Sequence, residues 1–348
     1  MITRARKIAS TVHDRGAFAS SPLLCERHQM GKPPKPVRTV AEVMKSVERS
    51  AARKKKAREK AAAEVAARVP GEGYEPCIVS FIDVLGFRDL LATRHAHDIR
   101  DIMLRLRKFT TPDEVERPRR MKDARLYSQP FADSVSDAVV RVRVFDTQYH
   151  DGAFFHELLD LLHAQIQCVG SGVVVRAGVT IGNAHVGLDG RGPVFGPAMV
   201  RAYEIETHEA IYPRIIVDQS AYNAFLTDKR LRKEGHSAKM EAGYVDKLLR
   251  VDADGSRYID YLTGSESEFD HPGDYFEFLD SHAALVRDKL ATTTDSVRAK
   301  FEWLASYHNS VVGQIIDEFT SGARSSEAFW EEFDCDPLPL LHTMVVEI

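Results

Sequence analysis

The stretch Cys77-Ile78-Val79-Ser80-Phe81-Ile82-Asp83-Val84-Leu85-Gly86-Phe87 decides the fold of this chain. Its continuous apolar run is typical of a strand covered on both faces, and it ends at a carboxylate, Asp83. Gly86 follows three residues later and allows the backbone to approach a ligand closely. An amphipathic segment then begins at Arg88, and the start of a helix there offers unpaired N–H groups to phosphate. We therefore expect Asp83 to be held by a rigid strand and to face a cleft.

A second acidic residue lies in a pattern typical of a β-hairpin. Two strand-like runs within 125–143 flank Ala132-Asp133-Ser134, which predicts a hairpin with Asp133 at its tip. Two aspartates at the ends of adjacent strands can hold a pair of divalent cations for in-line attack at phosphorus. A single Asp at a strand end is more often a turn or capping residue, so the hypothesis depends on Asp83 and Asp133 acting together.

Four segments, in their order along the chain, resemble the signature of class III nucleotidyl cyclases: Phe81–Phe87, Phe131–Ser134, Arg176–Gly182 and Phe195–Ala198. Within that class the chain most resembles the Pycsar cyclases, which are bacterial antiphage enzymes that make cyclic UMP or cyclic CMP. The segment Lys300–Asn309 is similar to their helical C-terminal region. The resemblance covers residues 77–309 and rests on the order of the motifs, since no single one is decisive.

The resemblance implies a metal site and a reaction. Asp83 and Asp133 would bind two Mg²⁺ or Mn²⁺ ions, with the main-chain carbonyl of Val84 as a third ligand. One cation would lower the pKa of a ribose 3′-hydroxyl and the other would hold the triphosphate. The 3′-oxygen would then displace pyrophosphate from the α-phosphorus. The resemblance assigns further residues to nucleotide binding, namely Phe81, Leu85, Gly86, Phe87 and Tyr203, and the amides from Leu85 to Phe87 would cradle phosphate oxygens.

Two departures from the family pattern bear on the base. Purine-specific class III cyclases usually carry a Lys four residues before the second metal aspartate, where this chain has Gln129. They carry an Asp three residues before the glycine that matches Gly196, where this chain has Pro193. A glutamine amide can complement either pyrimidine edge, and a purine edge left unpaired in a buried pocket is discriminated against. We expect UTP or CTP as the substrate; the choice between them stays open because the amide can flip.

A further departure concerns the transition state. The family's Asn and Arg align with Val200 and Glu204, and neither residue can neutralise phosphate charge. Arg201, or Arg176 on the neighbouring strand, could supply a cation instead, and an ordinary salt bridge is the alternative for both. Class III sites usually form between two protomers, so the resemblance implies a homodimer with composite active sites. It also implies a separate effector that responds to the cyclic nucleotide.

Two other functions stay open. The chain could be an adenylate or guanylate cyclase with an unusual base pocket. It could also be a degenerate cyclase-like domain that binds a nucleotide and regulates a partner without catalysis, which the absent Asn and Arg favour and the paired Asp83 and Asp133 oppose.

The charge of the chain is divided unevenly. Among 348 residues the net charge is −4, but residues 1–70 carry 17 Lys and Arg against 6 Asp and Glu, a local +11 that leaves −15 on the remainder. An acidic body attracts nucleic acid poorly. A basic helix is predicted within 40–69, and we interpret it as a solvated helix or coiled-coil arm. Contact of this arm with nucleic acid or an anionic membrane is the less favoured alternative.

The cysteines and the hydropathy pattern indicate a cytoplasmic protein. Cys25, Cys77, Cys168 and Cys335 lie far apart without a C-x-x-C pair, which argues against a zinc site or a disulfide framework and fits a reducing compartment. No apolar run approaches the roughly 20 residues that a transmembrane helix needs.

The predicted elements follow the order β-α-β-β-α-β-α-β, namely 77–82, 88–108, the hairpin 125–143, a helix around 154–166, 173–181, 196–208 and 213–217. This order suits an α+β, ferredoxin-like class III cyclase fold with helices on one face of the sheet. A strand pair (247–252 and 257–262) and two long helices (275–290 and 294–320) follow. We expect three parts: a basic, partly disordered or helical extension (1–70), the catalytic domain (75–265) and a helical region (266–348) that packs on the core or the dimer interface.

Overall fold

The computed structural model describes residues 74–108, 130–135, 137–186, 193–327 and 335–348, together with Lys56, Ser128 and Phe329. The predicted basic arm, apart from Lys56, and the base-reading candidate Gln129 lie outside these residues. The chain divides into two units, Met1–Lys56 and Ala57–Ile348. Every helix and strand named below belongs to the second unit.

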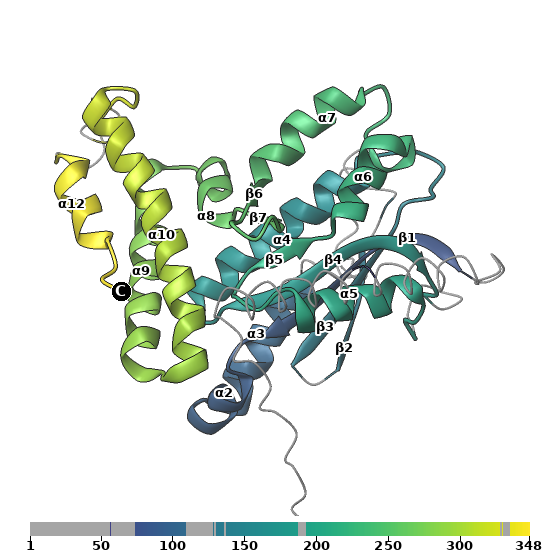
Figure 1. The fold of residues 1–348 in the computed structure, drawn as a ribbon, viewed down its shortest axis with the longest axis horizontal. Helices are drawn as coiled ribbons and strands as arrows, with labels where there is room; N and C mark the ends of the chain where they lie inside the picture. Colours follow the sequence, from purple (N-terminus) through teal and green to yellow (C-terminus); the bar gives the residue numbers. More distant parts are fainter. Residues whose placement is uncertain are drawn as a thin grey trace, which may run out of the picture. The chain divides into compact units, whose positions relative to one another are not determined.

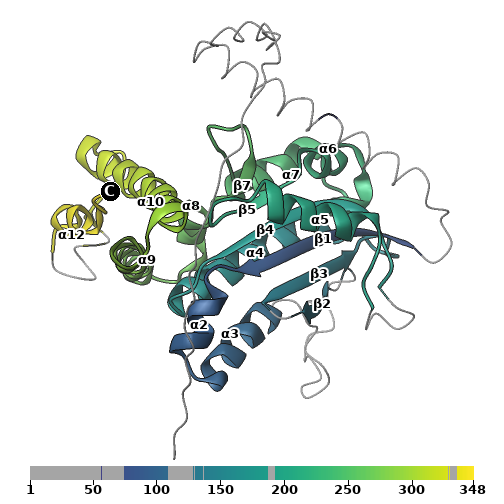
Figure 2. The same cartoon turned by 60° about the horizontal axis from the view of Figure 1, so that its bottom comes forward.

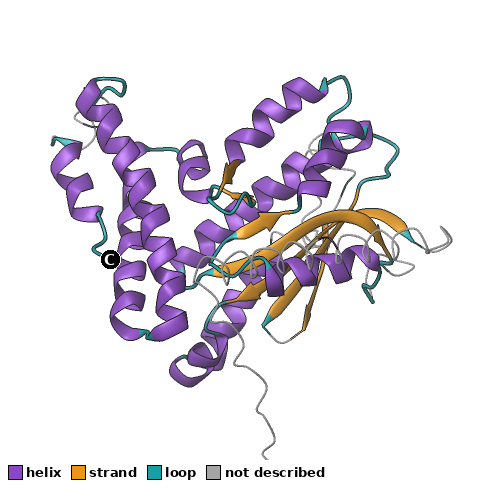
Figure 3. Ribbon diagram, in the orientation of Figure 1, coloured by secondary structure: helices purple, strands orange, loops and turns teal. Residues whose placement is uncertain are grey.

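Within the described residues, seven strands form one sheet in the order β2-β3-β1-β4-β5-β7-β6. Figure 3 shows the sheet in orange among the purple helices. The strands are β1 (Glu75–Val84), β2 (Pro130–Val135), β3 (Ala138–Val144), β4 (Val175–Ala184), β5 (Ile215–Val217), β6 (Leu249–Val251) and β7 (Arg257–Ile259). Strands β1 to β4 pair with one another in antiparallel fashion, whereas β4 pairs with β5 in parallel. With helix α3 (Ala96–Lys108) before β2 and helix α4 (Ala153–Gly170) before β4, they form the ferredoxin-like unit. The predicted α+β class with a ferredoxin-like core is confirmed.

Helices cover both faces of the sheet (Figure 2), so the prediction of helices on one face is wrong. Ile78 and Ile82 of β1 share a core with Phe154 and Leu158 of α4. On the opposite face, Cys77, Val79, Val140 and Val142 pack against Ala198 and Ala202 of helix α5 (Pro197–His208). The reason is in β1, whose alternate residues are apolar in both directions and therefore need a cover on each side.

The predicted helix 88–108 is two helices, α2 (Phe87–Thr93) and α3. Arg94 leaves the helical conformation with φ −115° and ψ 154°. The amide of His95 donates to the Asp98 carboxylate at 3.3 Å, which caps the start of the second helix. The amphipathic pattern continues across this point, and the break between the helices is marked by Asp98, whose carboxylate caps the backbone three residues earlier.

The predicted C-terminal helices are confirmed as α9 (Pro272–Thr292) and α10 (Asp295–Ser321), and α12 (Pro337–Met344) follows them (Figure 1). They share one hydrophobic core with α4 and the sheet. Some elements were not predicted. Between β5 and β6 these are α6 (Gln219–Thr227), α7 (Ala238–Val245) and two short 3-10 segments (Lys229–Leu231, Asp246–Leu248), and after β7 they are α8 (Tyr261–Gly264) and a third 3-10 segment (Ser265–Glu268). Among the described helices none combines the length and the apolar composition that a bilayer span requires.

Helix α10 is fixed to the sheet through an arginine set among aromatic rings. The guanidinium of Arg214 lies 5.3 Å from the ring centroid of Tyr212 and 5.6 Å from that of Trp303. The two rings stack at 5.3 Å, and the Trp303 indole N–H donates to Asp252 at 3.0 Å. Asp252 also pairs with Arg214. Cation–π contact and a buried ion pair therefore hold α10 against the β6–β7 edge.

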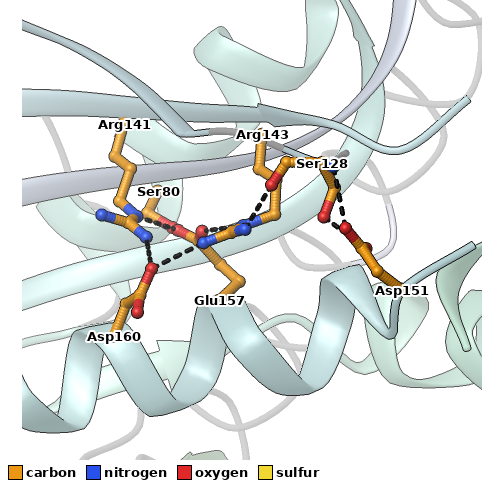
Figure 4. Close-up of polar contacts among 7 residues, drawn as sticks. All are labelled: Ser80, Ser128, Arg141, Arg143, Asp151, Glu157 and Asp160. Carbon is orange, nitrogen blue, oxygen red and sulfur yellow. Dashed lines mark hydrogen bonds and ion pairs between the residues drawn. The ribbon is translucent and has the colours of Figure 1, made fainter. Parts of the chain in front are cut away.

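A charged network is buried between the sheet and α4 (Figure 4). Arg141 and Arg143 of β3 are fully buried, and their Nε atoms donate to the two oxygens of Glu157 at 2.7 and 2.9 Å. Asp160 accepts from both arginines, and the Ser80 hydroxyl donates to Glu157 at 2.9 Å. Each buried charge is thus paired, which is the condition under which burial is tolerated.

The same network reaches the residue before Gln129. Arg143 donates to the carbonyl of Ser128. The Ser128 amide and hydroxyl donate to Asp151 at 2.9 and 2.5 Å (Figure 4). The chain is therefore tied, two residues before β2 begins, to β3 and to the segment just before α4.

Candidate functional site

Asp83 lies one residue before the end of β1, on the face that α5 covers. The next turn of chain contains Gly86, which has φ 74° and is the residue before α2. This left-handed backbone favours glycine. The close approach of this turn to a ligand stays a prediction. The Leu85 amide, in contrast, donates to the carbonyl of Val174 at 3.0 Å. That amide is therefore engaged within the sheet rather than directed to a phosphate.

The position of Asp133 differs from the prediction in two respects. Asp133 lies within β2 and pairs with Val140, and the turn of the hairpin falls at Asp137. Strand β3 lies between β2 and β1, so the two aspartates are not on adjacent strands. The hairpin itself is confirmed, but Ser-Asp turn chemistry places its tip after the β-branched Val135.

The sheet register sets the separation of the two aspartates. Asp83 pairs with Ala138, which pairs with Val135 on β2, two positions beyond Asp133. With strands about 4.8 Å apart and a rise of about 3.3 Å per residue, their Cα atoms lie about 12 Å apart.

Arg176 occupies the position beside Asp83. The two residues are opposite each other on β4 and β1, and Arg176 Nε donates to Asp83 Oδ2 at 3.0 Å. Its Nη2 lies 2.8 Å from Oε1 of Glu206 on α5. Burial raises the pKa of Asp83, and the hydrogen bond and charge of Arg176 oppose that rise. Burial likewise raises the pKa of Glu206, again against the charge of Arg176.

Three charged residues that we did not predict belong to this end of the sheet: Asp137, Glu206 and Lys300. Asp137 is near enough to raise the pKa of Asp83, and its carbonyl accepts from the Val84 amide at 3.4 Å. Burial and the charge of Arg176 lower the pKa of Lys300 on α10, against the opposing charges of Asp83 and Glu206. Only Glu206 had a signal in the sequence, because it lies four residues after Ala202 on the inward face of α5.

Two residues assigned to nucleotide binding are brought together by β1 and α5. The rings of Phe81 and Tyr203 meet edge to face with centroids 5.3 Å apart. Phe81 is two residues before Asp83 on the same face of β1, and Tyr203 is about half exposed. This places an accessible aromatic edge beside the Asp83 carboxylate.

Arg201 does not join this group. Its Nε is 3.2 Å from Asp218 and its Nη1 is 2.8 Å from Glu209. Burial would raise the pKa of Asp218, but the hydrogen bonds and charge of Arg201 outweigh that effect and lower it. Val200 and Glu204, which align with the family's missing Asn and Arg, lie on the outer side of α5. Arg201 is thus committed to a salt bridge in this structure.

The side chains at the end of β1 are of the type that binds a hard divalent cation. Asp83 supplies a carboxylate and Asp137 is a second acid close enough to affect it, and carboxylate oxygens are preferred ligands of Mg²⁺ and Mn²⁺. Among the described side chains no three acidic, histidine or cysteine groups gather as a complete ligand set. The side chain of Asp133 is not among those described. Asp83 is therefore the residue here that could bind such an ion, and in this structure its carboxylate pairs with Arg176.

No protein-family model matches this sequence, and no curated protein matches it either. Solved structures similar to the chain include the monomeric guanylyl cyclase domain of the RhoGC fusion protein from the aquatic fungus Blastocladiella emersonii. That comparison has a TM-score of 0.33 and 13% identity over 53% of this chain and 94% of the other. A rhodopsin-guanylyl cyclase catalytic core with converted specificity, in complex with ATPαS, gives a TM-score of 0.33 and 12% identity over 53% and 96%. The fold assignment rests on the strand order rather than on these similarities.

Proposed function

We propose that the chain is a pyrimidine nucleotide cyclase, which converts UTP or CTP into the 3′,5′-cyclic nucleotide and pyrophosphate. The observation that carries this proposal is the position of Asp83 at the end of the central strand of a ferredoxin-like sheet. There it lies beside the Phe81–Tyr203 pair and among charged groups from β4, α5 and α10. The motif order of the sequence supports the same assignment.

Each residue has a defined role in this proposal. Asp83, Asp133 and the Val84 carbonyl would hold two Mg²⁺ or Mn²⁺ ions, and these would supply positive charge near the 3′-hydroxyl and the triphosphate. The amides of Gly86 and Phe87 contact phosphate oxygens, and the rings of Phe81 and Tyr203 contact the nucleoside. Gln129 reads the pyrimidine edge. Arg176, or Arg201 from a partner protomer, balances charge that develops on the phosphates.

The test is turnover of each nucleotide by the purified chain. The protein is incubated with Mn²⁺ and separately with ATP, GTP, UTP and CTP, and the products are separated by chromatography. We expect cyclic UMP or cyclic CMP together with pyrophosphate. Asp83→Asn and Asp133→Asn should each abolish turnover, whereas Asp101→Asn on the exposed side of α3 should not. Turnover of ATP or GTP alone would contradict the pyrimidine assignment, and normal turnover by either Asn variant would contradict the two-metal assignment.

A second candidate is a nucleotide-binding regulatory domain without catalysis. It is favoured by the pairing of Arg176 with Asp83 and by the apolar Val200 at the position of a transition-state residue. Isothermal titration with UTP or CTP measures nucleotide binding, and a pyrophosphate assay on the same samples separates the two candidates. The regulatory domain binds the nucleotide and releases no pyrophosphate.

The biological role that we propose is antiphage signalling. The cyclic nucleotide would be read by a separate effector, and the enzyme would act as a homodimer with composite sites. Cyclic nucleotide should rise after phage infection in cells that express the wild-type chain and stay at the uninfected level in cells that express Asp83→Asn.

A further inference from the structure

The guanidinium of Arg176 lies between two carboxylates that belong to different elements. Its Nε faces Asp83 of β1 at 3.0 Å, and its Nη2 faces Glu206 of α5 at 2.8 Å. Arg176 is 22% exposed, and the Glu206 side chain is almost entirely buried. One cationic side chain thus lies between two acids. It donates a hydrogen bond to Asp83, and it forms an ion pair with Oε1 of Glu206, which has no hydrogen-bond partner among the described residues.

A divalent cation at Asp83 would compete directly with this contact. The cation and the guanidinium carry like charges and would share one carboxylate, so one of them must withdraw. Arg176 has a second acceptor to which it can turn. Glu206 can take that role, because its Oε2 accepts from the Thr207 hydroxyl at 2.9 Å while its buried Oε1 has no hydrogen-bond partner in the described part of the chain and lies 2.8 Å from Nη2 of Arg176.

We propose that Glu206 is a positioning residue that retains the guanidinium of Arg176 when a divalent cation takes Asp83. The site opens through the shift of one side chain, with the sheet and α5 in place. Without Glu206, Asp83 is the one of these two acids that the Arg176 guanidinium can still contact. The guanidinium then blocks cation binding at Asp83 more strongly. The inference rests on the assignment of Asp83 as a metal ligand in the proposed function.

The test measures Mn²⁺ binding to the nucleotide-free full chain, by isothermal titration and by the electron paramagnetic resonance signal of free Mn²⁺. Arg176→Gln should bind Mn²⁺ about tenfold more tightly than wild type, and Glu206→Gln about tenfold more weakly. In the Arg176→Gln background, Glu206→Gln should change the affinity by less than about twofold, since the residue it positions is absent. Equal effects of Glu206→Gln in both backgrounds would overturn the proposal, because they would reflect only the loss of a nearby negative charge.

Arg176→Lys provides a second variant that keeps the charge. A lysine ammonium is a point charge and does not bridge two carboxylates as a guanidinium does, so this variant should bind Mn²⁺ about threefold more tightly. Unchanged affinity would contradict the proposal. Arg324→Gln is the matched control, since Arg324 is also held between two carboxylates, Glu266 and Glu318, at a similar 24% exposure. It should leave Mn²⁺ affinity unchanged.

The outcomes also separate this inference from the proposed function. If wild type binds Mn²⁺ and Asp83→Asn does not, the metal assignment holds, and the Arg176 and Glu206 variants then test the inference alone. If Asp83→Asn binds Mn²⁺ as wild type does, the metal assignment of Asp83 fails and the inference fails with it. Thermal unfolding of each variant confirms that the protein compared is folded.

Discussion

His282 and His308 stack nearly parallel in the buried interface of α9 and α10, with their Nδ1 atoms 3.1 Å apart. The neighbouring groups define where the hydrogens lie. His308 Nε2 is 3.1 Å from the carbonyl of Met344, which can only accept. His308 Nδ1 therefore accepts from His282, whose Nε2 accepts from the Tyr261 hydroxyl at 2.6 Å. Every hydrogen bond in the series from Tyr261 to Met344 has one donor and one acceptor when both imidazoles are neutral.

Acid should therefore destabilise the C-terminal helices. Burial lowers the pKa of His308 to about 4, and burial together with the charge of His308 lowers the pKa of His282 well below its ordinary value. As the pH falls, these histidines take up protons in the unfolded state at a higher pH than in the folded state. The stability that is present above their unfolded pKa of about 6.5 is therefore lost as the pH falls through the pKa values of the folded state. For His308 the loss amounts to about 3 kcal/mol.

The measurement is the free energy of unfolding in urea between pH 7.5 and pH 4.5. His308→Gln keeps a donor for Met344 and cannot titrate, so its unfolding free energy should fall less steeply with acid than that of wild type. His97→Gln, at an exposed histidine of α3, is the control and should follow the wild-type curve. Parallel curves for all three proteins would contradict the assignment.

Glu157→Ala should destabilise the protein by about 3–5 kcal/mol, because it leaves two buried guanidinium groups with only one carboxylate between them. Asp101→Ala is the control, since it removes an exposed ion pair with Arg100 and should cost less than about 1 kcal/mol. Urea unfolding at neutral pH measures the loss of unfolding free energy in both variants. A loss for Glu157→Ala as small as that for Asp101→Ala would show that the network contributes little.

Gly178→Ala and Gly313→Ala should change stability in opposite directions. A Cβ at residue 178 would lie 2.4 Å from the Ala202 carbonyl oxygen and 2.5 Å from the Ile205 Cβ, so α5 would be forced off β4. We expect a loss of about 1–3 kcal/mol. A Cβ at residue 313 in α10 meets no atom within 4 Å, and alanine there should add about 0.5–1 kcal/mol. Thermal unfolding of both variants checks the signs, and a stabilised Gly178→Ala protein would refute the close packing.

A fragment that ends at residue 265 should not unfold cooperatively. It lacks Tyr307, whose hydroxyl accepts from the Leu262 amide at 3.0 Å and donates to Asp260 at 2.6 Å. It also lacks Trp303, which covers Arg214. The fragment 74–348 is the control and should show a sharp transition by circular dichroism. A sharp transition for 74–265 as well would mean that the C-terminal helices are dispensable for folding.

The fold was predictable from the sequence to the extent that it depends on local pattern. The apolar run before Asp83, the hairpin around 125–143 and the long stripe that includes Trp303 and Tyr307 each specify their own element. The order of these elements was enough to indicate the ferredoxin-like core. The hairpin tip was misplaced because Ala132-Asp133-Ser134 and Ser136-Asp137 both carry turn residues, and the strand register decides between them.

The candidate site was less predictable, because its contacts join residues far apart in the chain. Asp83, Arg176 and Glu206 meet only once β1, β4 and α5 are assembled. The sequence indicated Asp83 and Arg176 as separate candidates and gave no reason to pair them. The pairing of Arg201 with Asp218 depends in the same way on where α5 meets the start of α6.

The absence of a side chain at residue 178 has a consequence for how this site could change its ligand. Because the backbone of α5 rests directly on β4, Tyr203 and Glu206 stand at a fixed height above the central strand. In a nucleotide complex of the kind we propose, a base of another size would therefore have to be accommodated by elements other than α5. Divergence in specificity among related chains should then leave the α5 side constant in shape.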